Sequence, residues 1–136
     1  MAKQKLVGSC LCSRVKFSVD ADMQHFYFCH CLQCQKTSGS AHVANILAKP
    51  TDIEWLSGSE FVKRFDHPSG RSFTRVFCSE CGCGLPYINV EATTLFIPAG
   101  CLDNDPGIQP EKNIFWIEKA SWYEAGKEAS TCPGFP

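Results

Sequence analysis

The sequence has almost no excess charge of either sign. Its 136 residues include 13 Lys and Arg against 14 Asp and Glu, which gives a formal net charge of −1. Nucleic acids and anionic membrane surfaces are bound mainly through clustered positive charge, so neither is an expected partner. Disorder is not expected either, because 44% of the residues are hydrophobic and only 20% are charged.

Long apolar runs are also missing. None approaches the roughly 20 residues that cross a bilayer as a helix. The N-terminal sequence MAKQKLVG has no apolar segment of the kind that marks a secretory signal. We therefore expect a cytoplasmic protein that does not contact a membrane.

Helical periodicity is rare, and β-type runs take its place. Residues 14–20 alternate polar and apolar side chains, the period of a half-buried strand. Turn residues separate this run from other strand candidates, and one such turn is expected at residues 67–70. The other candidates are residues 25–28, 42–47, 52–56, 60–65, 71–77, 85–90, 94–97 and 114–117.

Only two short helices are expected. One covers residues 32–38 and is ended by Gly39, and the other lies near residues 121–125 with Ser121 as its N-cap. The length suits one domain, residues 1–136. Many short strands and few helices predict an all-β fold of antiparallel sheets.

Cysteine, by contrast, is abundant, with ten in the chain. Most fall in three clusters: CLC at residues 10–12, CHCLQC at 29–34 and CSEC at 78–81. Without an export signal a disulfide framework is not favoured. Zinc takes four ligands in a tetrahedron, and closely spaced cysteines offer several thiolates from one bend of the backbone. The spacing therefore favours metal binding.

Two of the clusters readily supply four thiolates, from Cys10, Cys12, Cys78 and Cys81. A zinc site closed by four thiolates is structural, because no coordination position is left for chemistry. The alternative is that these four are core cysteines without a metal.

The remaining cluster offers three cysteines, Cys29, Cys31 and Cys34, just before a predicted helical turn. The N-terminus of a helix favours thiolates. Three protein ligands with an open fourth position are typical of a catalytic zinc.

A fourth protein ligand would close this second site, and the candidates are Cys83, Cys101 and His30. His30 lies between two ligands, so we expect it to be a polar group oriented by backbone hydrogen bonds instead. Cys83 and Cys101 are interpreted as packing residues, because free cysteine is often buried. Cys132, in a predicted coil tail, is expected to be an exposed thiol.

Other residues have two interpretations each. Arg71 and Arg75 precede Cys78 and could bind an anionic group of a substrate, or else form surface ion pairs. Trp116, Trp122 and Tyr123 could line a pocket or pack in the core.

Taken together, the ordered clusters resemble the glutathione-dependent formaldehyde-activating enzyme family, also called the CENP-V/GFA domain. The residues that carry the resemblance are GSCLC at 8–12, CHCLQCQK at 29–36, FCSECG at 77–82 and GCLD at 100–103. The match runs from about residue 6 to the C-terminus. Three positions differ from the usual family pattern: Gln35, Cys83 and Asn113 stand where Arg, Ser or Thr, and His are frequent.

The resemblance implies an Mss4-like fold of antiparallel β-sheets that is stabilised by zinc. It implies two Zn²⁺ ions per chain: a structural ion on Cys10, Cys12, Cys78 and Cys81, and a catalytic-type ion on Cys29, Cys31 and Cys34. The family's named reaction joins formaldehyde to glutathione and gives S-hydroxymethylglutathione, a carbon–sulfur lyase chemistry.

The expected partners are therefore a small-molecule thiol, such as glutathione, and a small aldehyde. Glutathione carries two carboxylates, so Lys36, Arg71 and Arg75 are candidates for its recognition. The alternative function is a zinc-stabilised binding module without catalysis. An open three-cysteine site favours the enzyme, and a fourth protein ligand on that site favours the module.

Overall fold

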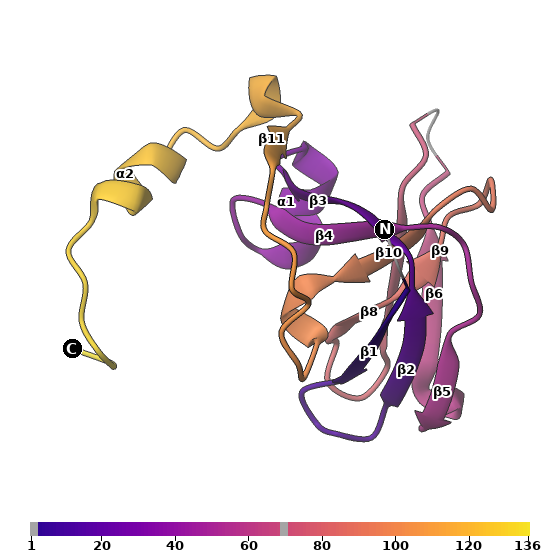
Figure 1. Cartoon of the computed structure of the whole chain (residues 1–136). Helices are drawn as coiled ribbons and strands as arrows, with labels where there is room; N and C mark the ends of the chain where they lie inside the picture. The colour runs from indigo at the N-terminus through magenta and orange to yellow at the C-terminus, as the bar shows by residue number, and fades with distance from the viewer. Residues whose placement is uncertain (1–2, 69–70) are drawn as a thin grey trace.

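The computed structural model describes residues 3–68 and 71–136, and its strands form three sheets (Figure 1). The first sheet has the order β1 (Gln4–Ser9), β2 (Lys16–Ala21), β5 (Glu54–Ser57). The second has the order β11 (Lys112–Ile114), β3 (Met23–Cys29), β4 (Val43–Ala48), β10 (Leu95–Pro98), β9 (Tyr87–Ile88). The third has the order β6 (Val62–Asp66), β7 (Thr74–Cys78), β8 (Gly84–Leu85).

The helices are few and short. In the part of the chain that the structure describes, two are α-helices, α1 (Leu32–Ser38) and α2 (Tyr123–Glu128), and three are single 3₁₀ turns, η1 (Ser59–Phe61), η2 (Ala99–Cys101) and η3 (Trp116–Glu118). The predicted all-β class is confirmed. No helix within residues 3–68 and 71–136 is long and apolar enough to cross a membrane.

One strand pair departs from the expected antiparallel pattern. β11 runs parallel to β3, with Asn113 opposite Phe28 and Ile114 opposite Cys29. A parallel pair needs a long connection, and the chain between β3 and β11 supplies one by passing through the other sheets. This pairing brings the segment after residue 111 beside the CHCLQC cluster.

The strand boundaries show where sequence pattern is insufficient. β1 was not expected, because Gly8 occupies an inward position on it and gives no apolar signal. A side chain there would collide with the ring of Phe17 and the carbonyl of Cys101.

The run at 85–90 is split at Pro86, which lacks the N–H needed for strand pairing. The run at 114–117 ends early, because Phe115 adopts a left-handed backbone with φ of 53°. Residues 69 and 70 of the predicted turn lie outside the described residues.

Among the described residues, two apolar clusters form most of the core, and a third surrounds Cys29, Cys31 and Cys34. The larger lies between the first two sheets and centres on Leu6, Val19, Ile46, Leu95 and Ile97, none of which is more than 1% exposed. The smaller gathers apolar side chains of the first and third sheets together with cysteines: Cys10, Val15, Phe17, Val76, Cys78, Leu85 and Cys101. The four-cysteine group is therefore continuous with the core.

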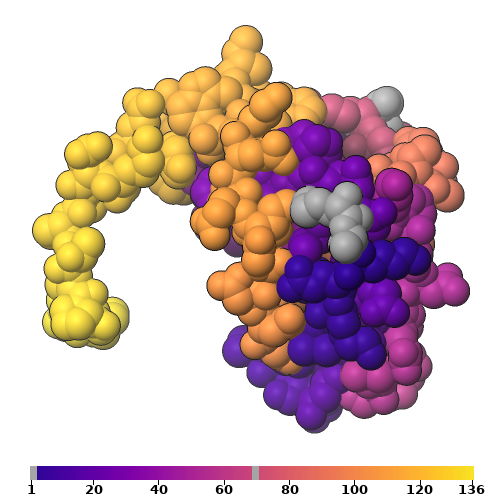
Figure 2. Space-filling model, in the orientation of Figure 1, coloured from indigo at the N-terminus to yellow at the C-terminus, as the bar shows by residue number. Residues whose placement is uncertain are grey.

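Helix α1 follows β3 directly. Cys31 is its N-cap, and Gly39 ends it with a left-handed φ of 63°. The predicted second helix begins two residues later than expected, with Trp122 and not Ser121 at its N-cap position. Figures 1 and 2 show that α2 and the tail after it extend away from the sheets.

Candidate metal centres and the adjoining cavity

Two loops bring four cysteines together. Cys10 and Cys12 lie in the turn between β1 and β2, while Cys78 ends β7 and Cys81 follows in the next turn. Their four sulfur atoms lie within 4.8 Å of one another. The Cys10–Cys12 and Cys12–Cys78 sulfur separations are 3.5 and 3.9 Å. Sulfur atoms around a tetrahedral zinc are about 3.8 Å apart, so this group fits a metal ion.

Backbone amides support the sulfur atoms of this group. The N–H of Val15 donates to Cys10 Sγ at 3.3 Å, and the N–H of Glu80 donates to Cys78 Sγ at 3.4 Å. Such donors stabilise the charged form of a thiol. Both turns are therefore shaped to hold thiolates.

The pKa values within the four-cysteine group diverge. A backbone hydrogen bond from Arg14, assisted by its guanidinium, lowers the pKa of Cys12 to about 6. Burial raises the pKa of Cys78 to about 11. A cation among the sulfurs would favour the thiolate at both positions.

The second group, Cys29, Cys31 and Cys34, is held by one short segment. Cys29 ends β3, Cys31 caps α1 and Cys34 lies in the first turn of that helix. The N–H of Cys34 donates to Cys31 Sγ at 3.3 Å. All three cysteines are buried, and their sulfur atoms lie within 4.8 Å of one another.

In this group, the pKa values of Cys29 and Cys34 are shifted in opposite directions. A hydrogen bond from the Cys34 thiol lowers the pKa of Cys29 to about 6. The same contact, together with burial, raises the pKa of Cys34. Three buried thiolates so close together repel one another unless a cation lies between them. The donor set therefore fits a thiophilic metal ion.

The three candidates for a fourth ligand are not part of this group. Among the described residues, the group of His, Cys, Asp and Glu atoms that could share an ion there contains only the three cysteines. Cys83 and Cys101 pack instead in the smaller core cluster, as expected, and Cys132 is exposed. The ring of His30 is fully buried, and its Nε2 lies 2.9 Å from Oδ1 of Asn113.

The partner of His30 differs from the prediction. Its side chain is oriented by the side chain of Asn113, not by the backbone. Trp116 and Tyr123 pack edge-on against the His30 ring, with centroids 5.0 and 4.8 Å away. Trp122 is 57% exposed, so it is not a core residue.

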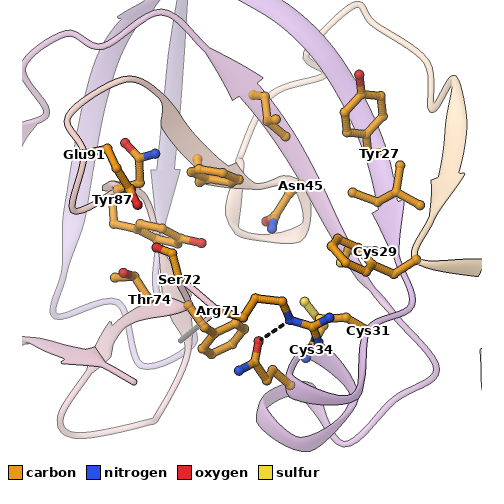
Figure 3. A pocket seen from close by; sticks show the side chains of 17 residues that line it. Tyr27, Cys29, Cys31, Cys34, Asn45, Arg71, Ser72, Thr74, Tyr87 and Glu91 are labelled. Atoms are coloured by element: carbon orange, nitrogen blue, oxygen red, sulfur yellow. Dashed lines mark hydrogen bonds between the residues drawn. The ribbon is translucent and has the colours of Figure 1, made fainter. Parts of the chain in front are cut away.

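A cavity of about 370 Å³ adjoins the three-cysteine group (Figure 3). Cys29, Cys31 and Cys34 form part of its wall, and strands β3, β4, β9 and β10 supply much of the rest. The aromatic side chains that line it are Tyr27, Phe73, Tyr87, Phe96 and Phe115. A small molecule that enters this cavity therefore meets the three sulfur atoms.

The three predicted substrate-binding cations lie in different places. Arg71 lines the cavity, and it pairs with Glu118 at 2.9 Å and contacts the ring of Phe115 at 4.8 Å. Arg75 instead donates to the Gly82 carbonyl at 3.0 Å and lines two other cavities. Lys36, in the last turn of α1, is not among the residues that line the cavity.

Comparison with known proteins identifies the family. The model of the glutathione-dependent formaldehyde-activating enzyme family matches residues 5–118. The chain belongs to this family. A Rhodobacter sphaeroides protein of known crystal structure shares the fold, with a TM-score of 0.58 and 18% identity, over 81% of this chain and 98% of that one. No curated protein sequence matches.

The positions that differ from the usual pattern of the formaldehyde-activating enzyme family lie outside the cavity. Gln35 donates to the carbonyls of His30 and Glu118, and so joins α1 to the C-terminal segment. Asn113 holds His30, and Cys83 packs in the core. None of the three lines the cavity.

Sequence reasoning missed several polar residues that line the cavity of this family member, among them Asn45 and Glu91, and it also missed Glu118, which pairs with the lining residue Arg71. Asn45 lies in β4, and Glu118 holds Arg71. Asn45 had a signal, since it is the single polar side chain in the otherwise apolar run VANILA. Nothing in the sequence marked Glu118, because its ion pair with Arg71 forms only where the C-terminal segment passes beside α1.

Proposed function

We propose that this protein joins a thiol to a small aldehyde at the three-cysteine group. Formaldehyde and glutathione are the aldehyde and thiol in the name of its family. The observation that carries the proposal is the wall of the 370 Å³ cavity, where three buried cysteines converge without a fourth protein ligand among the described residues. Such a site leaves room for a substrate sulfur.

Zinc is the ion that this donor set suits best, because thiolates and a tetrahedral site are its usual structural environment. Cys29, Cys31 and Cys34 would hold one ion, and Cys10, Cys12, Cys78 and Cys81 a second. When bound, zinc lowers the pKa of a coordinating thiol and so supplies a thiolate at neutral pH.

The reaction is an addition that balances without a further reactant. A bond forms between sulfur and the carbonyl carbon, the carbon–oxygen double bond becomes single, and the thiol proton ends on oxygen. The walls of the cavity would hold the two reactants side by side. The Arg71 guanidinium, fixed by Glu118, stands beside the sulfur atoms and favours their charged form.

The alternative is a zinc-stabilised module that binds a partner without catalysis. That function needs no cavity, and it favours a second site closed by a protein ligand. The cavity and the three-ligand group support the enzyme instead.

The test is the rate of thiol–formaldehyde condensation with the zinc-loaded protein. We expect acceleration above the uncatalysed rate, lost in Cys34→Ser and kept in Cys132→Ser, which changes an exposed cysteine of the tail. No acceleration by the zinc-loaded protein with any small thiol would contradict the proposal. Equal activity in both variants would also contradict it.

A further inference from the structure

A second, smaller cavity of about 60 Å³ adjoins the cavity of 370 Å³. Five residues border both: Cys34, Asn45, Phe73, Thr74 and Tyr87. The smaller volume exceeds the roughly 10–15 Å³ that one water molecule needs, but it is far below the roughly 300 Å³ at which sites for drug-sized ligands begin. An aldehyde as small as formaldehyde therefore fits the smaller cavity, whereas a tripeptide such as glutathione fits only the larger one.

The smaller cavity lies next to the three-cysteine group. Cys29, Cys31 and Cys34 all border the larger cavity, and Cys34 also borders the smaller one. A thiol that reaches the three sulfur atoms from the larger cavity would therefore have the smaller cavity beside its own sulfur. An aldehyde must take up such a position for its carbon to be attacked.

Tyr87 brings a hydrogen-bond donor to the junction of the two cavities. Its ring is held by stacking on Phe96, with centroids 5.2 Å apart. Its hydroxyl makes no hydrogen bond within the described residues and is not enclosed by protein, and Figure 3 shows it pointing into the cavity. Burial raises the pKa of Tyr87, so the hydroxyl keeps its proton at neutral pH.

Asn45 brings a second donor. Its Oδ1 is enclosed by protein without a partner, so this end of the carboxamide does not reach the cavity. Its Nδ2 is not enclosed and makes no hydrogen bond within the described residues. In Figure 3 the carboxamide points into the same space as the Tyr87 hydroxyl. The nitrogen is therefore the end that a ligand can meet.

The other polar side chains around the smaller cavity already donate to protein atoms. The Thr37 hydroxyl donates to carbonyls of its own helix, and that of Thr74 donates to Asp66 at 2.6 Å. Arg75 donates to the Gly82 carbonyl at 3.0 Å. Within the described wall of this cavity, the hydroxyl and carboxamide donors without a partner are those of Tyr87 and Asn45.

We propose that Tyr87 and Asn45 form an oxyanion hole in the smaller cavity, where the Tyr87 O–H and the Asn45 N–H donate hydrogen bonds to the aldehyde oxygen. When the thiolate sulfur bonds to the carbonyl carbon, one electron pair of the C=O bond moves to this oxygen, and the two donors stabilise the charge that develops there. The proton released by the thiol ends on the same oxygen. The inference rests on the proposed function and adds the residues that activate the aldehyde.

The kinetic test is Tyr87→Phe, which removes the hydroxyl and keeps the stacked ring. In the zinc-loaded protein we expect kcat of the glutathione–formaldehyde condensation to fall about a hundredfold, while KM for glutathione changes less than about twofold. Tyr123→Phe is the matched control, because Tyr123 packs on His30 and lines neither cavity, and it should keep the rate. An unchanged kcat in Tyr87→Phe would overturn the inference and leave the proposed function standing.

A binding test examines the same donors without a reaction. S-formylglutathione carries a carbonyl oxygen beside its sulfur, and S-ethylglutathione has a similar shape without that oxygen. Calorimetry on the zinc-loaded protein should show about fivefold tighter binding of the formyl compound, the scale of one neutral hydrogen bond. Tyr87→Phe and Asn45→Leu should lose this preference, and Tyr123→Phe should keep it. The absence of a preference in the unmodified protein would overturn the inference.

Melting temperatures separate a structural role from the proposed one. Tyr87→Phe should melt like the unmodified protein, because its hydroxyl has no partner within the described residues. A lower melting temperature with the preference for the formyl compound intact would show a structural role and overturn the inference. A preference that is lost in Tyr87→Phe, in a protein that does not accelerate the condensation, would instead contradict the proposed function alone.

Discussion

The two cysteine groups differ in how the chain assembles them. The four-cysteine group joins two turns that lie far apart in sequence, and it is continuous with the smaller core cluster. The three-cysteine group comes from residues 29–34 alone and borders a cavity. A metal at the first would therefore tie the fold together, whereas a metal at the second would change mainly what the cavity can bind.

The largest expected effect is that of Cys81→Ser. Losing a structural metal that joins two segments belongs to the few changes that cost more than about 4 kcal/mol of stability. We expect the variant to be largely unfolded, as measured by circular dichroism and thermal melts. Cys132→Ser, in the exposed tail, is the control and should melt like the unmodified protein. Normal melting of Cys81→Ser would show that the four-cysteine group is not structural.

A smaller effect is expected for Cys34→Ser at the other group. Its three cysteines are local in sequence, so their metal closes no long loop. We expect the variant to remain folded, to hold one zinc ion per chain in place of two, and to lose at most about 2 kcal/mol, the scale of ordinary point mutations. Elemental analysis and melts measure both results. Damage equal to that of Cys81→Ser would abolish the distinction between the two groups.

The smallest effects are expected from alanine substitutions at two glycines, one that ends helix α1 and one that directly follows Cys81. Gly39 and Gly82 have φ of 63° and 75°, and a Cβ at either position would meet nothing within 4 Å. Alanine at each position therefore costs only the left-handed backbone strain, about 1 kcal/mol. Gly82→Ala should speed release of the metal of the four-cysteine group to a chelator, and Gly39→Ala that of the three-cysteine group. Faster release from the opposite group in either variant would contradict this assignment.

Much of the fold was predictable because its determinants are local. The alternation at residues 14–20 predicted β2, and the sequence before Gly39 predicted α1, since strand period and helix termination are properties of adjacent residues. β1 was not predicted, because the glycine at position 8 is required by the close approach of Phe17 and Cys101, and both of these are distant in the sequence. The parallel β11–β3 pair escaped for the same reason.

The candidate site, like the fold, was predictable only where its determinants are close together in the sequence. Close spacing and residue type were enough to group the cysteines. The cavity was not predictable, because its wall comes from several strands and its charge depends on Glu118, which reaches Arg71 only through the path of the C-terminal segment. Asn45 stood out as a polar residue in an apolar strand, but only the fold shows that it points into the cavity (Figure 3).

The most direct test of the difference between the two groups is X-ray absorption at the zinc edge, with and without a bound thiol. One ion with four sulfur ligands and one with three give an average of about 3.5 sulfur atoms per zinc, with the remaining ligand oxygen or nitrogen. Adding a thiol that binds should raise the average to about 4 and remove the light-atom ligand. An average of about 4 before any thiol is added would contradict the open site. An average that does not change when a thiol binds would contradict sulfur coordination.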